Sequence, residues 1–356
     1  MDSLTYFETY HVARLVIIFS TAFVTAFIVM PVWIAFLRRL KMGKAIRDEA
    51  TAPVMAKLHA MKAGTPTMGG LVIWGTVLGL ILLYRTACAA DVDALCSLSF
   101  LSRAQTRLPL GILVAAGVIG LLDDYLNARK IGPRGGGLRK RVRIISFMTI
   151  AFVGAYWFYS RLEWDFVHVP FVGTFHLGWL YVAFFVLVMV ATSFSANEAD
   201  GLDGLAGGTF MTAFGAFAII ALAQGRLDLS AFCLAIFGAL LAFLWFNVPR
   251  ASIFMGDTGS MSLGSVLAAV AMITNTALLL PIIALPFVIE TLSVLVQMVW
   301  KRAFGKKLFQ SSPLHHHLEA IGWPESQIVM RCWIVSIISA ALGVILALID
   351  PTRNIF

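Results

Sequence analysis

The amino-acid sequence predicts an all-α integral membrane protein with about ten transmembrane helices. Three observations lead to this fold class. First, 60% of the 356 residues are hydrophobic and 13% are charged, whereas soluble domains are about half apolar and a quarter charged. Second, the apolar residues form runs of roughly 20, the length that crosses the hydrocarbon core of a bilayer. Third, the positive charges concentrate in alternate loops, as membrane topology requires.

Ten apolar runs are predicted to be transmembrane helices. Their expected bounds are 14–37, 68–84, 108–126, 144–160, 177–196, 205–223, 231–248, 259–277, 279–300 and 329–349. The first run follows acidic residues and lacks both a basic leader and a small-residue cleavage site, so we expect a retained helix rather than a signal peptide. Without repeats or low-complexity linkers, residues 1–356 are predicted to form a single polytopic domain.

The basic residues predict the orientation of these helices. Of 27 Lys and Arg residues, seven lie within 38–62, seven within 129–143, four within 301–307, and one is Arg250. These 19 cations follow the first, third, seventh and ninth runs, on alternate loops of one side. The positive-inside rule then makes those loops cytoplasmic and both termini periplasmic. The net charge of +8 therefore reflects topology, and no nucleic-acid partner is expected.

The four cysteines are Cys88, Cys96, Cys233 and Cys332, and they lack the spacing of metal ligands. Cys88 and Cys96 share an outer loop and could pair in an oxidising compartment. The simpler interpretation is that they are two small residues near a helix end. The sequence leaves both possibilities open.

Three acidic motifs follow odd-numbered runs and should therefore lie on one face of the membrane. Asp123 and Asp124 end the third run, Asp200 and Asp203 follow the fifth, and Asp257 follows the seventh. Polar residues often mark helix ends, but these acids each lie beside a glycine or another acid. Adjacent carboxylates near a membrane stay ionised only beside a divalent cation or Lys and Arg. Mg²⁺, which combines few carboxylates with substrate phosphates, is the expected ion.

Glycines and cations accompany the acids. In DGLDGLAGG at 200–208, Gly201 and Gly204 allow a ligand to approach the backbone closely, and the next helix presents its N-terminal amides to an anion. The loop 129–143 carries seven cations directly after Asp123 and Asp124. Attraction to anionic lipid, about 1 kcal/mol per cation, explains most of them. The others are candidates to clamp a diphosphate or a lipid phosphate.

The loop after the ninth run contains His315, His316 and His317. Three consecutive histidines cannot share one helix face, so at most one or two are expected to face a substrate. A polar loop can carry histidines without a function. Opposite three acidic motifs, however, one of them is a candidate to donate to a phosphate or to act as a general acid–base group.

Three further residues suit a nucleotide. Phe254 could stack on a base, although packing against the bundle is the more frequent outcome for a single Phe. Lys62 and Thr67 precede the second run and offer a cation and a hydroxyl. The neighbouring Pro66 and glycines fit an ordinary helix start equally well.

These motifs, in this order, resemble the polyprenyl-phosphate N-acetylhexosamine-1-phosphate transferases over essentially the whole chain. The motifs that carry the resemblance are GTPTMGG at 64–70, LDDY at 122–125, DGLDGLAGG at 200–208, LWFN at 244–247, FMGDTGS at 254–260 and PLHHHLEAIGWPE at 313–325. GTPTMGG and the triple His followed by GWPE look specific to the muramoyl-pentapeptide branch of the family.

The resemblance implies ten transmembrane helices in the bacterial cytoplasmic membrane, a cytoplasmic active site, Mg²⁺ as cofactor and a homodimer. The implied reaction transfers phospho-MurNAc-pentapeptide from UDP-MurNAc-pentapeptide to undecaprenyl phosphate and gives lipid I and UMP, the first membrane step of peptidoglycan synthesis. One alternative is transfer of GlcNAc-1-phosphate from UDP-GlcNAc. A secondary transporter is less consistent with the sequence, because it predicts midplane acids and an inverted repeat. An inert scaffold would tolerate the loss of any single Asp.

Carried onto this sequence, the resemblance implies that Asp257 binds Mg²⁺ and that Asp123, Asp124 and the three histidines are catalytic. The implied substrate-binding residues are Lys62, Thr67, Asn197, Asp200, Gly201, Leu202, Asp203, Asn247, Phe254 and Arg134. Two positions depart from the family pattern. Glu198 and Ala199 stand where the family commonly has Leu-Thr, and Arg134 stands where it has lysine.

Two reaction routes fit these residues. In one, Asp124 or Asp123 forms a covalent phospho-sugar intermediate as UMP leaves. In the other, one of these acids deprotonates the lipid phosphate, which attacks the donor directly. We expect direct attack with Asp123 as the base, and the sequence does not separate the two routes.

Overall fold

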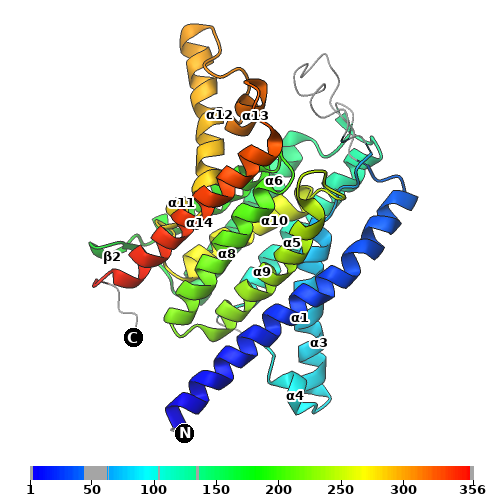
Figure 1. Cartoon of the computed structure of the whole chain (residues 1–356). Coiled ribbons are helices and arrows are strands. Elements are labelled where there is room, and N and C mark those ends of the chain that lie inside the picture. The colour runs from blue at the N-terminus through cyan, green and yellow to red at the C-terminus, as the bar shows by residue number, and fades with distance from the viewer. Residues whose placement is uncertain (1–2, 44–61, 63, 103–104, 134–135, 353–356) are drawn as a thin grey trace.

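The structure, a computed structural model, describes residues 3–43, 62, 64–102, 105–133 and 136–352 and is a bundle of long helices (Figure 1). Within these ranges, eight helices are long and apolar enough to cross a membrane. They are α1 (Ser3–Arg39), α3 (Gly70–Ala89), α5 (Arg107–Ala128), α6 (Lys140–Arg161), α7 (Leu180–Ala199), α8 (Leu205–Ala223), α9 (Leu227–Asn247) and α14 (Glu325–Ile349). The prediction of a mostly helical, multi-pass membrane protein is confirmed.

The eighth and ninth predicted runs form helices that differ from those eight. The run 259–277 becomes α10 (Asp257–Ile273), which is only 17 residues long, and the run 279–300 is divided into α11 (Leu280–Ile283) and α12 (Leu285–Phe304). Proline lacks a backbone N–H, so Pro286 can begin α12 but cannot continue α11 into it. α12 and the short helix α13 (Leu314–Ala320) project from the bundle, at the end away from the start of α1 (Figure 1).

α10 is the central helix of the bundle. Every residue from Thr258 to Ile273 is buried, and α10 packs against α3, α5, α7 and α8. Its serine hydroxyls donate to carbonyls one turn earlier, as Ser262 does to Thr258 at 2.5 Å, so they are satisfied among apolar neighbours. This enclosure fixes the position of Asp257, the first residue of α10.

Two small features lie outside the helical pattern. An antiparallel hairpin pairs β1 (Phe166–Val169) with β2 (Gly173–His176), which the all-α prediction did not include. Cys88, in α3, forms a disulfide with Cys96, the last residue of α4 (Asp93–Cys96). The interpretation of these cysteines as two unpaired small residues is therefore wrong.

Candidate active site

The side chains of the three acidic motifs meet at one end of the bundle. Asp257 contacts the ends of α5 and α7, and Asp203 contacts the segment that precedes α10. The segment before α3 joins them, because the Phe254 N–H donates to the Pro66 carbonyl at 2.8 Å. The expectation that these loops share one face of the molecule agrees with this geometry.

Asp124 holds the start of α10 against α5. Its two carboxylate oxygens accept the backbone N–H groups of Asp257 at 3.1 Å and Thr258 at 3.0 Å. These N–H groups have no partner within the helix, and a carboxylate beside them also interacts favourably with the helix dipole. Gly256 precedes them with φ +74°, and a Cβ there would collide with Asp124 and approach the Thr67 hydroxyl. Glycine is therefore required at position 256.

Asp123 and Asp257 converge on one arginine. Arg143 Nη1 lies 3.2 Å from Asp123 Oδ2 and 2.9 Å from Asp257 Oδ2. Asp123 also accepts the Leu138 N–H, and Asn197 donates to Asp257 Oδ1 at 2.8 Å. One cation of the predicted basic loop 129–143 thus neutralises the acids, as opposite charges at this distance should. Arg143 was not among the residues predicted for the site.

The same carboxylates fit a magnesium ion. Among the described residues, no group of three or more His, Cys, Asp or Glu could hold a metal. Mg²⁺, however, is commonly held by one or two carboxylates together with substrate phosphates. Asp123 and Asp257 each direct an oxygen at one guanidinium nitrogen. These are hard oxygen ligands converging on one point, and they suit Mg²⁺.

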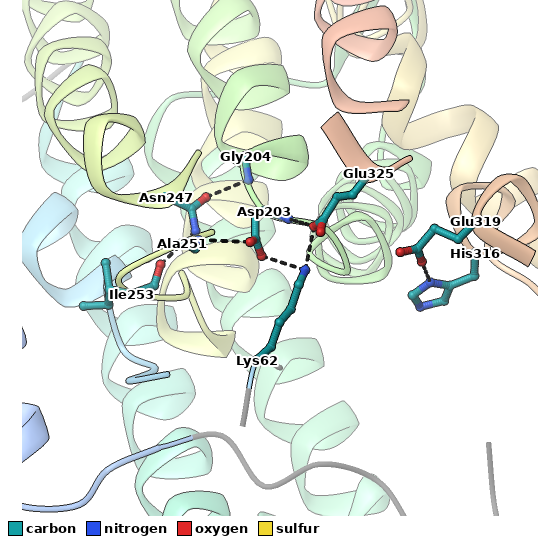
Figure 2. Close-up of polar contacts among 9 residues, drawn as sticks. All are labelled: Lys62, Asp203, Gly204, Asn247, Ala251, Ile253, His316, Glu319 and Glu325. Carbon is teal, nitrogen blue, oxygen red and sulfur yellow. Dashed lines mark hydrogen bonds and ion pairs between the residues drawn. The ribbon is translucent and has the colours of Figure 1, made fainter. Parts of the chain in front are cut away.

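Lys62 joins two acids beside this site (Figure 2). Its Nζ lies 2.8 Å from Asp203 Oδ1 and 2.5 Å from Glu325 Oε1. Glu325 also accepts the Asp203 N–H at 2.7 Å, and Asp203 accepts the Ala251 N–H at 3.0 Å. Burial lowers the pKa of Lys62, but hydrogen bonds and attraction from the two carboxylates outweigh it, so the pKa lies above its ordinary value. Lys62 therefore carries its charge at neutral pH.

Two predicted binding residues shape the loop between α7 and α8. Asn247 accepts the Gly204 N–H at 3.0 Å and donates to the Ile253 carbonyl at 2.8 Å, which links this loop to the one after α9 (Figure 2). The Leu202 side chain packs in an apolar cluster with Ile328 and Val329 of α14. Leu202 therefore anchors the loop through its side chain.

The three histidines point in different directions, as their spacing predicts. His315 is fully buried, with Nδ1 3.0 Å from Glu290 Oε2 of α12. His316 Nδ1 lies 3.0 Å from Glu319 Oε2, and His317 Nδ1 accepts the Gln310 N–H at 3.3 Å.

Three further predicted residues lie on the segments that surround the site. Thr67 is buried close to Gly256, and Phe254 is half-buried in the segment paired with Pro66. Asp200 directly follows the last residue of α7 and caps the helix. Arg134, which was predicted to bind the substrate, lies outside the described residues.

Two further residues at the site, Glu290 and Glu325, were not predicted from the sequence. Glu290 lies inside an apolar run, where an ionisable side chain is by itself a signal of function. Glu325 ends the motif PLHHHLEAIGWPE and follows Pro324 at the start of α14. An acid directly after a proline marks a helix start, but this signal does not reveal a partner 263 residues away.

The fold and the site define a multi-pass membrane transferase. Residues 107–275 match glycosyl transferase family 4, and residues 62–73, which include GTPTMGG, match signature 1 of phospho-N-acetylmuramoyl-pentapeptide-transferase.

Known proteins of that name are similar over nearly the full chain. The phospho-N-acetylmuramoyl-pentapeptide-transferase of Geobacillus thermodenitrificans (strain NG80-2) is 41% identical over 333 residues, covering 93% of this chain and 97% of its own length. That of Bacillus anthracis is 40% identical, covering 91% and 95%. That of Chloroflexus aurantiacus (strain ATCC 29366 / DSM 635 / J-10-fl) is 37% identical, covering 95% and 90%. The chain belongs to the phospho-N-acetylmuramoyl-pentapeptide-transferase family, which confirms the resemblance inferred from its motifs.

Proposed function

We propose that the protein transfers phospho-MurNAc-pentapeptide from UDP-MurNAc-pentapeptide to undecaprenyl phosphate, giving lipid I and UMP in the bacterial cytoplasmic membrane. The observation that carries this proposal is the convergence of Asp123 and Asp257 on Arg143 at the start of α10. Transfer between two polyanions is limited by charge repulsion and alignment. The pair of carboxylates would hold a metal ion, and the fixed cation neutralises charge. The enclosed helix keeps these groups rigid.

We assign the donor nucleotide to the loops around Lys62. Lys62, Asp203 and Asn247 hold three loops together, and Gly201, the Leu202 backbone, Thr67 and Phe254 lie on the same loops. Arg134 remains a proposed contact for the substrate phosphates. Asn197 and Asp200 mark the end of α7, where Asn197 orients Asp257. A bound Mg²⁺ would be held by Asp257 with Asp123 beside it, and would withdraw charge from the phosphates.

The contacts of Asp124 argue against that residue as the nucleophile, and we propose direct attack. Asp124 already accepts two backbone N–H groups, which stabilise its charge and make it a weaker nucleophile. Asp123 is the proposed base. It takes the proton of the lipid phosphate, whose oxygen then attacks the phosphorus next to the sugar as the bond to UMP breaks. Arg143, which contacts both Asp123 and Asp257, would stabilise the charge that develops on the phosphate.

We propose that α10 and α12 complete ten membrane spans, with the site on the cytoplasmic face and both termini outside. The cations of alternate loops support this orientation. The disulfide between Cys88 and Cys96 supports it too, because disulfides persist in oxidising compartments and both cysteines lie in the predicted outer loop. The homodimer is carried over from the family resemblance alone.

The test is transfer of radiolabelled phospho-MurNAc-pentapeptide to undecaprenyl phosphate by the purified protein, with UDP-GlcNAc in parallel and with Mg²⁺ or EDTA. We expect lipid I only from the muramoyl donor and only with Mg²⁺. Transfer from UDP-GlcNAc instead would place the protein in a sister branch, and no transfer from either donor would refute the proposal. Trapping a phospho-sugar on Asp123 or Asp124 would contradict direct attack.

A further inference from the structure

Glu290 is a buried acid in the middle of the ninth apolar run. Only 3% of its surface is exposed, and a carboxylate in such surroundings requires polar partners. Gln297, two turns further along the same face of α12, binds the backbone of Leu308 and Phe309. This face of α12 therefore holds the segment that leads into α13, and Glu290 meets that segment at His315.

Glu290 binds His315 through two donors. Its Oε2 lies 3.2 Å from the His315 backbone nitrogen and 3.0 Å from the ring nitrogen Nδ1. The backbone N–H can only donate, so this carboxylate oxygen is already an acceptor. An ionised carboxylate accepts and does not donate, which assigns the ring hydrogen to Nδ1. The other ring nitrogen, Nε2, then carries a lone pair.

His315 Nε2 faces the loop between α7 and α8. It is buried and has no hydrogen-bond partner among the described residues. A Cβ at Gly201 would collide with it, so the ring lies directly against this glycine. A buried, unpaired ring nitrogen is unfavourable unless water or a ligand satisfies it. His316 and His317 have partners on their own segment instead.

We propose that Glu290 is a positioning residue that holds His315 as the Nδ1–H tautomer and thereby presents Nε2, as an acceptor, to the loop at Gly201. Its partner in the working enzyme is a hydroxyl or N–H group of the nucleotide-sugar donor. A carboxylate behind a histidine commonly fixes tautomer and ring orientation in this way. The identity of that partner rests on the proposed function, whereas the tautomer is a property of the protein without substrate.

The tautomer is tested by ¹⁵N NMR of the purified full chain labelled at histidine, with the His315 signals assigned from their loss in His315→Gln. We expect a protonated Nδ1 and an unprotonated Nε2. Glu290→Gln retains an acceptor oxygen and should keep this tautomer. Glu290→Met, of similar size but without an acceptor, should give a mixture. Glu319→Gln, beside His316, should leave the His315 signals unchanged. A charged ring, an Nε2–H tautomer, or an unchanged spectrum in Glu290→Met would overturn the proposal.

Activity provides an independent measurement. We expect Glu290→Met to lower kcat/KM roughly tenfold to a hundredfold, Glu290→Gln to recover part of that loss, and Ser293→Ala on the same helix face to cause little change. In the His315→Gln background, Glu290→Met should cost almost nothing further, because both residues act through one ring. If the losses of kcat/KM in the two single variants add up in the double variant, Glu290 affects activity only through the stability of the protein. Absence of lipid I in the wild type, with the tautomer as expected, would instead refute the proposed function.

Discussion

Lys62 and Glu325 are 263 residues apart in the sequence and form an ion pair with 2.5 Å between Nζ and Oε1. Since the same carboxylate oxygen accepts the Asp203 N–H, the segment before α3, the loop after α7 and the start of α14 meet at one point. The shape of the proposed nucleotide site thus depends on a glutamate that was not among the predicted site residues.

Glu325→Gln should weaken donor binding more than it slows turnover. The amide keeps the shape of the carboxylate but loses its charge, so Lys62 and the Asp203 loop become less well ordered. We expect KM for the UDP donor to rise roughly tenfold, equivalent to about 1.4 kcal/mol, with kcat changed much less. Asp91→Asn, an exposed acid in the loop after α3, is the charge-matched control. Equal KM values in Glu325→Gln and wild type would show that the ion pair does not shape the site.

The raised pKa of Lys62 predicts a loss of stability at high pH. Because the folded pKa lies above the ordinary value of 10.5, the charged Lys62 contributes stability that is fully present below that pH. The contribution is lost as the pH rises through the folded pKa. The unfolding temperature of the wild type should therefore decrease more steeply above about pH 10.5 than the unfolding temperature of Lys62→Met. Parallel curves for the two proteins would contradict the network.

Gly256→Ala and Gly225→Ala should separate backbone strain from a steric clash. Both glycines have positive φ, +74° and +66°, and Gly256, with ψ 173°, lies in a region that is essentially restricted to glycine. Alanine is therefore strained at both positions, by about 1–3 kcal/mol. A Cβ at position 225 meets nothing within 4 Å, whereas one at position 256 meets Asp124 and Thr67. We expect both variants to unfold at lower temperature but only Gly256→Ala to lose most of its activity. Normal turnover in Gly256→Ala would show that the start of α10 tolerates displacement.

Arg143 should compete with Mg²⁺ for the two acids. Its guanidinium neutralises Asp123 and Asp257, so EDTA should abolish transfer without unfolding the wild type. Arg143→Met leaves the carboxylates unpaired, so the variant should be less stable in EDTA. Its unfolding temperature should also rise more than that of the wild type when Mg²⁺ is added. The control is the exposed Arg139→Met. An identical Mg²⁺ response in Arg143→Met and wild type would exclude competition.

The meeting of the acids at one end was predictable, because the positive-inside rule places every second loop on the same side. The individual partners were not. Nothing local in the sequence distinguishes Arg143 from six neighbouring cations, or links Glu290 to His315, because those pairings depend on how loops and α12 fold back. Leu202 shows the reverse case, since a residue within a binding motif directs its side chain into an apolar cluster.

The helices themselves followed from hydropathy, and the exceptions have physical causes. Pro286 divides the ninth run, and the glutamate within it binds a histidine rather than interrupting the helix. The hairpin Phe166–Val169 and Gly173–His176 was missed because strands of four residues are too short to show an alternating pattern.

The enclosure of α10 has a consequence for how this protein can change over evolutionary time. From Thr258 to Ile273 each side chain is surrounded by other helices, and close-packed positions accept few replacements. A comprehensive substitution scan should therefore find α10 among the least tolerant segments of the chain. Few substitutions in this helix should therefore give resistance to an inhibitor that binds at its start. Resistance substitutions are expected in the surrounding loops instead. Frequent resistance substitutions within 258–273 would contradict this expectation.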